Sequence, residues 1–306
     1  MVVLESSQEN FIDEIVPFYL DHAHIKGRLV RLGKQTESLL ANHSYPALVN
    51  QYIAEVISLA AVLSVDVKYE GVFTLQISSQ PDQASLIRLI TVDINTQGHI
   101  RAYAQWDQKI LHHEQDFILN PPCLQEVFGR GFMVFTADLA HQIERYQAIV
   151  ELQGKSLTDS MHHFFRQSDQ IPTALVLHSR SGSKEREFVA GAVILQRLPF
   201  SGDPTPEQQD QDSDDWFTNL SLLGTLTRKE LLNPDLSSFD LLYRLFHERN
   251  IHILKAKPLK SQCSCSLNRI QKMLENFSDD DRVGMAVDGQ IEIICEFCNK
   301  KYTLKA

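Results

Sequence analysis

The sequence predicts an α+β protein with an N-terminal mixed α/β domain built on an antiparallel sheet, a helical linker, and a small C-terminal four-cysteine domain. Between residues 72 and 196, stretches of alternating apolar and polar residues are interrupted by helical segments of unequal length, with no regular βαβ repeat. After residue 201, apolar residues recur at helical spacing behind an acidic stretch. Four of the five cysteines lie between residues 263 and 298. These patterns predict three parts, spanning residues 1–200, 201–249 and 250–306.

The composition is that of an ordinary globular protein. The 306 residues suffice for a sizeable core and more than one domain, and 43% of them are hydrophobic and 22% charged. A formal net charge of −10 argues against a nucleic-acid partner, which would require clustered Lys and Arg. No apolar run approaches the roughly 20 residues that span a bilayer, and the acidic segment 1–13 has no apolar signal core. We therefore expect a cytoplasmic protein without a membrane partner.

The first domain, residues 1–200, is expected to combine strands with a few helices. Residues 46–64 are apolar on more than one face, so this helix should pack on several sides. Period-two alternation predicts strands, three of which form an antiparallel meander between 72 and 104. Strands are expected at 27–32, 72–77, 86–92, 99–104, 131–137, 145–152, 173–179 and 187–196, and helices at 35–42, 46–64 and 156–167.

This domain carries no recognisable catalytic set. No nucleophile is accompanied by a base and an orienting group, so we expect a binding platform with no catalytic residues, and not an enzyme. The adjacent pairs His112-His113 and His162-His163 point in different directions on any regular element and do not predict a metal site. Cys123, which has no cysteine nearby in the sequence, is expected to be a buried, inert thiol.

The linker begins with an acidic stretch, residues 201–215, that its composition predicts to be a solvated loop. Two apolar stripes at helical spacing follow it. Their residues are Trp216, Leu220 and Leu223 in the first, and Leu242, Leu245 and Phe246 in the second. The helices can simply pack on the first domain, or their burial can depend on a neighbour whose state changes; the residues themselves leave both interpretations open.

The C-terminal cysteines are spaced as metal ligands. Cys263 and Cys265 form one close pair, and Cys295 and Cys298 form a second pair after a 29-residue excursion, residues 266–294. Four thiolates can close a tetrahedral shell around Zn²⁺ at about 2.3 Å each. In the reducing cytosol such a set indicates metal or redox chemistry, not a disulfide framework. Structural zinc is favoured, while a redox-switched zinc site, an iron–sulfur site and paired disulfides remain open.

The segment 250–306 has few apolar residues for a core. Residues 267–277 carry apolar side chains at helical spacing, and Ile291–Ile294 read as a strand that delivers Cys295. These side chains contribute several kcal/mol at best, against a larger ordering entropy. Structural zinc contributes about 10–16 kcal/mol of apparent folding free energy. The segment is therefore expected to fold only with one bound Zn²⁺.

Several segments carry a resemblance to a known family, and together they extend over nearly the whole chain. They are Gly27–Leu32, Glu144–Val150, Gln167–Thr173, Cys263–Ser266, Asp288–Glu292 and Cys295–Tyr302. These segments match segments of one family and follow each other in the same order. By them, the chain resembles the redox-regulated chaperones of the heat-shock protein 33 family.

The resemblance implies a holdase that works without ATP and responds to oxidative and heat stress. It implies a reduced, zinc-bound, inactive state, and oxidation to two disulfides, most simply Cys263–Cys265 and Cys295–Cys298, with release of zinc. The linker would then lose a packing partner and expose apolar surface to unfolding client proteins. Residues Trp216 to Phe246 would supply part of that surface, and the oxidised form would be a homodimer.

Two other classes of protein share some of these features. A zinc-ribbon regulatory protein would use the same metal but should show a basic face and stacking aromatics, which the acidic balance disfavours. A thiol oxidoreductase could use Cys295-x-x-Cys298, but that motif normally opens a helix after a strand. Here the pair is expected to lie between two strands.

Overall fold

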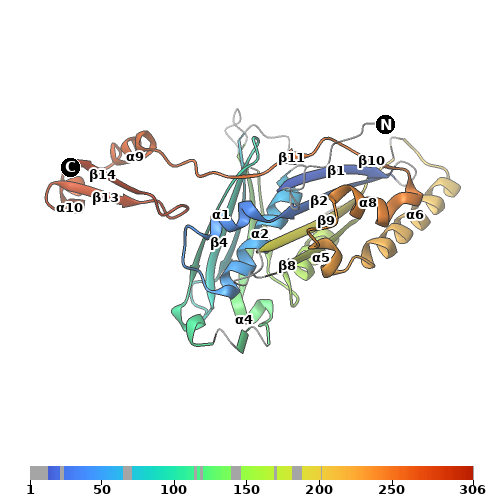
Figure 1. Cartoon of the computed structure of the whole chain (residues 1–306), viewed down its shortest axis with the longest axis horizontal. Coiled ribbons are helices and arrows are strands. Elements are labelled where there is room, and N and C mark those ends of the chain that lie inside the picture. The colour runs from blue at the N-terminus through green and yellow to red at the C-terminus, as the bar shows by residue number, and fades with distance from the viewer. Residues whose placement is uncertain are drawn as a thin grey trace.

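The structure is a computed structural model that describes residues 13–20, 24–64, 71–113, 116–117, 120–138, 146–168, 171–180, 188–200 and 202–305. Two six-stranded sheets form the N-terminal domain, and a two-stranded sheet with two helices forms a small C-terminal domain. The C-terminal domain protrudes at one end of the molecule, while helices α6 and α8 cover the opposite end (Figure 1). The predicted α+β class, with antiparallel sheets and a four-cysteine C-terminal domain, is confirmed.

The first sheet has the strand order β10-β1-β2-β9-β8, and a further strand, β11, also pairs with β1. All of these pairs are antiparallel. The strands are β1 (Glu14–Leu20), β2 (Ile25–Leu32), β8 (Thr173–Arg180), β9 (Val189–Arg197), β10 (Ile251–Ile253) and β11 (Lys257–Pro258). Strand β2 is buried along nearly its whole length because both faces of the sheet are covered.

The second sheet has the order β12-β5-β4-β3-β6-β7, so the predicted meander of three antiparallel strands lies at its centre. Its strands are β3 (Val72–Ser79), β4 (Ile87–Asn95), β5 (His99–Trp106), β6 (Gly131–Asp138), β7 (Tyr146–Glu151) and β12 (Lys260–Ser261). The short strand β12 pairs with β5 in the parallel direction. Thus the chain returns to this sheet immediately before the first cysteine pair.

Helix α2 (Ala47–Ser64) lies between the two sheets and contacts β2, β8 and β9 of one and β3, β4 and β5 of the other. Val56 and Ile57 are fully buried there, which confirms the prediction that this helix packs on several sides. The helix is long and apolar enough to cross a membrane, yet 72% of that stretch is buried inside the fold. The smaller helical elements are α1 (Lys34–Leu40), η2 (Gln108–His112), α4 (Leu124–Phe128) and α5 (Leu157–Ser168).

The prediction of a loop over residues 201–215 is wrong for most of that stretch, because helix α6 (Pro206–Gly224) begins within it. Thr205 caps the helix by accepting a hydrogen bond from the backbone N–H of Gln208, and Pro206 occupies the first turn. Acidic side chains near a helix N-terminus are also favoured by the helix dipole. Composition indicated solvation, whereas capping and local charge favour a helix.

Ion pairs further fix this acidic helix on the domain. Asp212 accepts from Arg197 at 2.5 Å, and Asp215 pairs with Arg249 at 3.2 Å. Both aspartates are buried, so these contacts satisfy carboxylates that would otherwise be costly to desolvate. Helix α6 is therefore tied to the end of β9 and to the last residue of the linker.

The linker helices α6, α7 (Arg228–Leu231) and α8 (Ser238–Phe246), with η3 (His247–Arg249), pack on the outer face of the first sheet. The six linker residues singled out in the sequence all belong to this contact. Trp216, Leu223, Leu242 and Phe246 are buried, and Leu220 and Leu245 are half-buried against the same cluster. The sheet, and not the C-terminal domain, is the linker's principal packing partner. Ile251, Ile253 and Ala256, at the start of the predicted third part of the chain, also pack against this cluster, so the linker has a second neighbour there.

Two side chains of the first sheet, Phe18 and Arg31, make specific contacts with the linker. Phe18 on β1 lies over Gly27, where a β-carbon would come within 2.1 Å of its ring, and it stacks on Phe246 at 5.7 Å between ring centroids. Arg31 on β2 donates to the backbone carbonyls of Leu231, at 3.1 Å, and of Asn233 and Leu236. Arg31 thereby satisfies carbonyls at the end of α7 and in the loop between α7 and α8.

After the linker, residues 251–261 form a crossing from the first sheet to the second before the chain enters the C-terminal domain. Strands β10 and β11 of this crossing pair with β1, and β12 pairs with β5. Leu259 within this crossing is buried in the core between the sheets. Strand pairing thus continues past the predicted boundary at residue 250 and ends at Ser261. The C-terminal domain contains α9 (Leu267–Leu274), α10 (Asp279–Met285), β13 (Gln290–Ile294) and β14 (Lys301–Lys305).

Candidate metal centre

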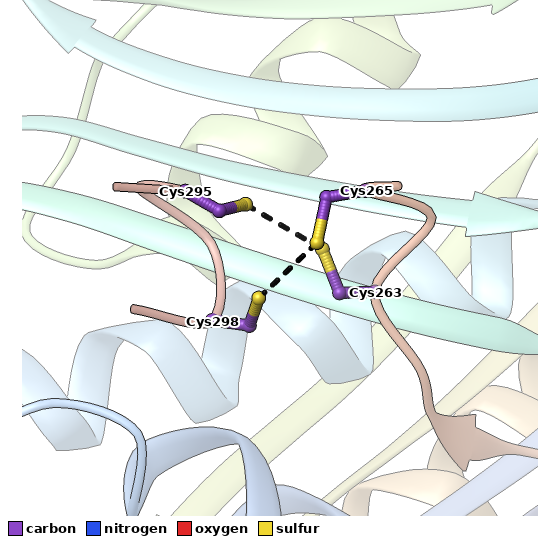
Figure 2. A group of neighbouring side chains, drawn as sticks. All are labelled: Cys263, Cys265, Cys295 and Cys298. Carbon is purple, nitrogen blue, oxygen red and sulfur yellow. Dashed lines mark hydrogen bonds between the residues drawn. The ribbon is translucent and has the colours of Figure 1, made fainter. Parts of the chain in front are cut away.

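The four C-terminal cysteines converge on one point from two segments of the chain (Figure 2). The Cys263 and Cys295 sulfurs are 3.7 Å apart, those of Cys265 and Cys298 are 3.4 Å apart, and all four lie within 4.8 Å of one another. Four ligands at about 2.3 Å from a tetrahedral zinc ion would be about 3.8 Å apart. The sulfur positions fit such a shell, so these residues can hold a metal ion. No second group of this kind occurs in the described part of the chain.

The second cysteine pair is held in the turn between β13 and β14. The backbone N–H of Cys298 and that of Asn299 both donate to the carbonyl of Cys295, at 3.3 and 2.8 Å. Asn299 adopts a φ of 54°, in the left-handed region that asparagine tolerates better than most residues. The N–H of Cys295 donates to the Lys300 carbonyl at 3.0 Å and closes the turn from the other side. The turn thus directs both sulfurs to the same side.

The first cysteine pair lies between β12 and α9. Ser266 caps α9 by accepting from the backbone N–H of Arg269 at 3.3 Å, which fixes where the helix begins. The Arg269 guanidinium donates to the Ser264 carbonyl at 3.1 Å, between the two cysteines. Helix α9 therefore holds the backbone between Cys263 and Cys265 in place through Arg269.

The C-terminal domain has a very small apolar core. Its buried hydrophobic residues are Ile270, Leu274, Ile291 and Tyr302, with Cys265 and Cys295 packed against them. Leu267, Met273 and Phe277, which share the helical spacing in the sequence, are exposed. At roughly 1.5–3 kcal/mol for each buried side chain, this core is weak beside the ordering entropy of the segment. The domain therefore needs a further source of stability, and a tetrahedral thiolate site can supply it.

Tyr302 acts on the sulfurs directly. Its hydroxyl donates to the Cys265 sulfur at 3.2 Å. Burial alone would raise the pKa of Cys265, but hydrogen bonds from Tyr302 and Cys298 lower it to about 7. Burial raises the pKa of Cys298 to about 12, and its bond to Cys265 adds to that rise. Because burial also raises the pKa of Cys263, Cys265 is more readily deprotonated than Cys263 or Cys298, and the thiolate is the form that binds metal.

Sequence reasoning did not single out Tyr302 as a site residue, although the alternation of β14 pointed its side chain to the buried face. Cys123 lies away from the four-sulfur group, at the N-terminus of α4 in the first domain. The expectation that Cys123 is buried needs correction, since it is half-buried. Its backbone N–H donates to the Glu126 carboxylate at 2.6 Å, so its position follows from helix capping.

The fold and the site define a class of protein: an α+β domain that carries a separate small domain in which four cysteines lie close enough to hold a metal ion. The family model described as Hsp33 protein matches residues 13–305, and the chain belongs to the Hsp33 family of chaperones.

Similar proteins cover almost the whole chain. A 33 kDa chaperonin of Caulobacter vibrioides is 30% identical over 96% of this chain and 95% of its own length. A 33 kDa chaperonin of Photorhabdus laumondii is 29% identical over 96% of this chain and 93% of its own length. The crystal structure of the 33 kDa chaperonin from Thermotoga maritima has a TM-score of 0.76 at 16% identity, covering 96% of this chain and 95% of that one. The last similarity supports the fold.

Proposed function

We propose that this protein is a redox-regulated holdase that works without ATP in the cytoplasm. It would be inactive while its four C-terminal cysteines are reduced and hold one Zn²⁺, and active once they are oxidised. The observation that carries the proposal is the convergence of four sulfurs within 4.8 Å in a domain with only four buried hydrophobic residues. The relatives named as chaperonins supply the chaperone class.

In the reduced state, the residues that would hold zinc are Cys263, Cys265, Cys295 and Cys298. When bound, zinc would join the two ends of the small domain and contribute about 10–16 kcal/mol to its folding. Two features of the chain favour this zinc-bound state. Tyr302 favours the thiolate of Cys265, and the turn 295–298 directs the other two sulfurs toward the first pair.

Oxidation would convert the four thiols into two disulfides. From the zinc-bound state, each disulfide forms from two thiolates, which give up two electrons; hydrogen peroxide accepts these electrons with two protons from solvent and becomes two molecules of water, and Zn²⁺ is released because its four donors are lost. The pairing we propose is Cys263–Cys265 and Cys295–Cys298. The sulfur contacts at 3.7 Å between Cys263 and Cys295 and at 3.4 Å between Cys265 and Cys298 run across these pairs, so disulfide mapping is a decisive measurement.

Once its sulfurs are oxidised, the C-terminal domain would unfold and release the preceding crossing, residues 251–261, from the sheets. That crossing pairs with β1 and β5 and contributes buried Leu259 to the main core. The linker helices are joined to it directly and lie on the same sheet. We propose that they loosen in turn, and that Trp216, Leu220, Leu223, Leu242, Leu245 and Phe246 then contact unfolding or oxidatively damaged client proteins.

Three functional units follow from this proposal: a platform over residues 1–200, a switchable linker over 201–249, and a redox-switch domain over 250–306. We further propose that the oxidised form is a homodimer, because a newly exposed apolar face can be covered by a second copy. A thiol oxidoreductase is less well supported, since Cys295-x-x-Cys298 lies in a turn between two strands and not at the start of a helix.

Light scattering by a heat-denatured client protein tests the proposal. The reduced, zinc-loaded protein should allow aggregation, and protein treated with peroxide should suppress it without nucleotide. A matched Cys123→Ser variant, altered outside the four-sulfur group, should behave like the wild type in both states. Equal suppression by the reduced and oxidised forms would contradict redox regulation, and failure of both forms would contradict the holdase function.

A further inference from the structure

The turn that carries Cys295 and Cys298 is docked on the N-terminal domain. The Asn299 side-chain amide donates to the Asn42 carbonyl and lies 3.1 Å from Nδ1 of His43. The other ring nitrogen of His43, Nε2, lies 3.3 Å from the Phe297 carbonyl. A single neutral tautomer satisfies both contacts, with Nδ1 accepting from the amide and Nε2 donating to the carbonyl. His43 therefore links two points of the turn at once.

Strand β5 contacts the same turn through side chains. The Arg101 guanidinium lies over the Phe297 ring, with 4.1 Å from its Cζ to the ring centroid. Tyr103 lies 6.2 Å from that ring between centroids, and its hydroxyl donates to the Glu296 carboxylate at 3.4 Å. Arg101 is itself fixed by Asp93 on β4, whose carboxylate accepts from its Nε at 2.7 Å. The cation–π contact is thus made by a guanidinium that is already positioned.

The same strand also positions the first cysteine pair. Strand β12 pairs with β5 through Lys260 with His99 and Ser261 with Ile100, and the N–H of Gln262 donates to the Ile100 carbonyl at 3.0 Å. The hydrogen-bonded register therefore ends at the residue before Cys263. The backbone of β5 thus fixes the chain just before Cys263 and Cys265. Side chains of β5 fix the turn that contains Cys295 and Cys298.

We propose that strand β5 and residues His43, Arg101 and Tyr103 form a docking surface that holds the two halves of the four-cysteine centre together. The three side chains are positioning residues: His43 and Tyr103 contact the turn that carries Cys295 and Cys298, and Arg101 lies over Phe297 of that turn and interacts with the Cys263 thiol. Groups that hold metal ligands in place typically change metal affinity 10–100-fold when they are removed, and we expect the lower end of that range for contacts made one residue away from a ligand. Metal retention and docking of the two domains are then coupled, and loss of either favours loss of the other. This inference rests on the proposed binding of zinc by the four cysteines.

The test uses full-length His43→Ala and Arg101→Lys, the second of which keeps a cation beside Asp93. The control is Arg282→Ala, because Arg282 pairs with Asp279 inside the C-terminal domain. Zinc content is measured first, and zinc release under peroxide is then followed with a coloured chelator. Both docking variants should bind one zinc per chain and release it about tenfold faster than wild type and control.

Hydrogen exchange supplies a readout that is independent of oxidation. In the reduced variants, amides of residues 295–300 and 99–103 should exchange faster than in wild type, while those of β3 remain protected and show that the first domain is folded. Zinc release and exchange equal to those of the Arg282→Ala control would overturn the docking proposal and leave zinc binding intact. Absence of zinc from the wild-type protein would instead contradict the proposed function itself.

Discussion

The linker and the C-terminal domain differ in how much apolar surface they bury. In the linker, Leu242 and Phe246 are fully buried and Trp216 is only 6% exposed, because the sheet beneath them is broad and apolar. In the C-terminal domain, Val283 and Val287 are 67% and 74% exposed, and four hydrophobic residues form the whole core. The linker can be stable through packing alone, whereas the C-terminal domain buries too little for that, and we propose that its four sulfurs supply the difference.

This difference explains how one chain can combine a part that is stable through packing with a part whose folding depends on conditions. Burial of apolar side chains responds little to oxidants, while thiolates react with them readily. In the proposed function, the four candidate metal ligands lie in the part with the least apolar burial, so the folding of that part would depend on redox state. The crossing β10–β12 connects the two regions physically, because it pairs with both sheets and ends beside Cys263. Changes that remove one source of stability should therefore affect the two regions unequally.

The largest effect is expected from Cys295→Ser. It removes one of four metal ligands, and with it most of the roughly 10–16 kcal/mol that structural zinc contributes. Metal analysis should find no stoichiometric zinc, and amides of β13 and β14 should lose protection from exchange. Cys123→Ser should keep one zinc per chain. Full zinc retention by Cys295→Ser would show that the sulfur cluster is not the metal site.

A smaller effect is expected from replacing Leu220 and Leu223 by Ser. Leu223 is 2% exposed on the sheet, and losing such a side chain costs roughly 2–5 kcal/mol. The linker should loosen and give partial suppression of aggregation without oxidant, while zinc content remains unchanged. Phe217→Ser is the matched control, because Phe217 lies on the same helix and is 65% exposed. If the double variant and the control behave alike, burial of the linker does not limit activity.

The smallest effect is expected from Tyr302→Phe, which keeps the buried ring and removes only the hydroxyl that donates to Cys265. Loss of a hydrogen bond to a metal ligand should weaken zinc binding about tenfold, or about 1.4 kcal/mol. Competition with a chelator of known affinity measures the change. Tyr243→Phe, altered on the exposed side of α8, serves as the control. An unchanged affinity in Tyr302→Phe would leave Tyr302 with a packing role alone.

The sequence predicted the parts of the fold whose signal is local. Period-two alternation located the strands from 72 to 104, and the cysteine spacing located the candidate metal centre, because each depends on neighbouring residues. The start of α6 was missed, although Thr205 and Gln208 form a capping box that the sequence contains. The acidic, polar composition of residues 201–215 favours a loop, whereas this short motif favours a helix start.

Other features could not be predicted because their causes are not local. Strands β11 and β12 are two residues long, so they show no periodicity and are defined only by their partners. The contact of His43 with Phe297 and Asn299 joins segments more than 250 residues apart in the chain. Nothing in a single sequence relates such positions, and the side chains involved are ordinary surface types.

Hydrogen exchange across residues 214–247, before and after oxidation, tests the central claim most directly. The account predicts slow exchange in the reduced, zinc-bound protein and fast exchange after peroxide treatment, because the linker is released when the C-terminal domain unfolds. Strands β3, β4 and β5 should remain protected in both states, which shows that the platform persists. Exchange in 214–247 that is unchanged by oxidation would contradict the account and mean that the linker is permanent structure.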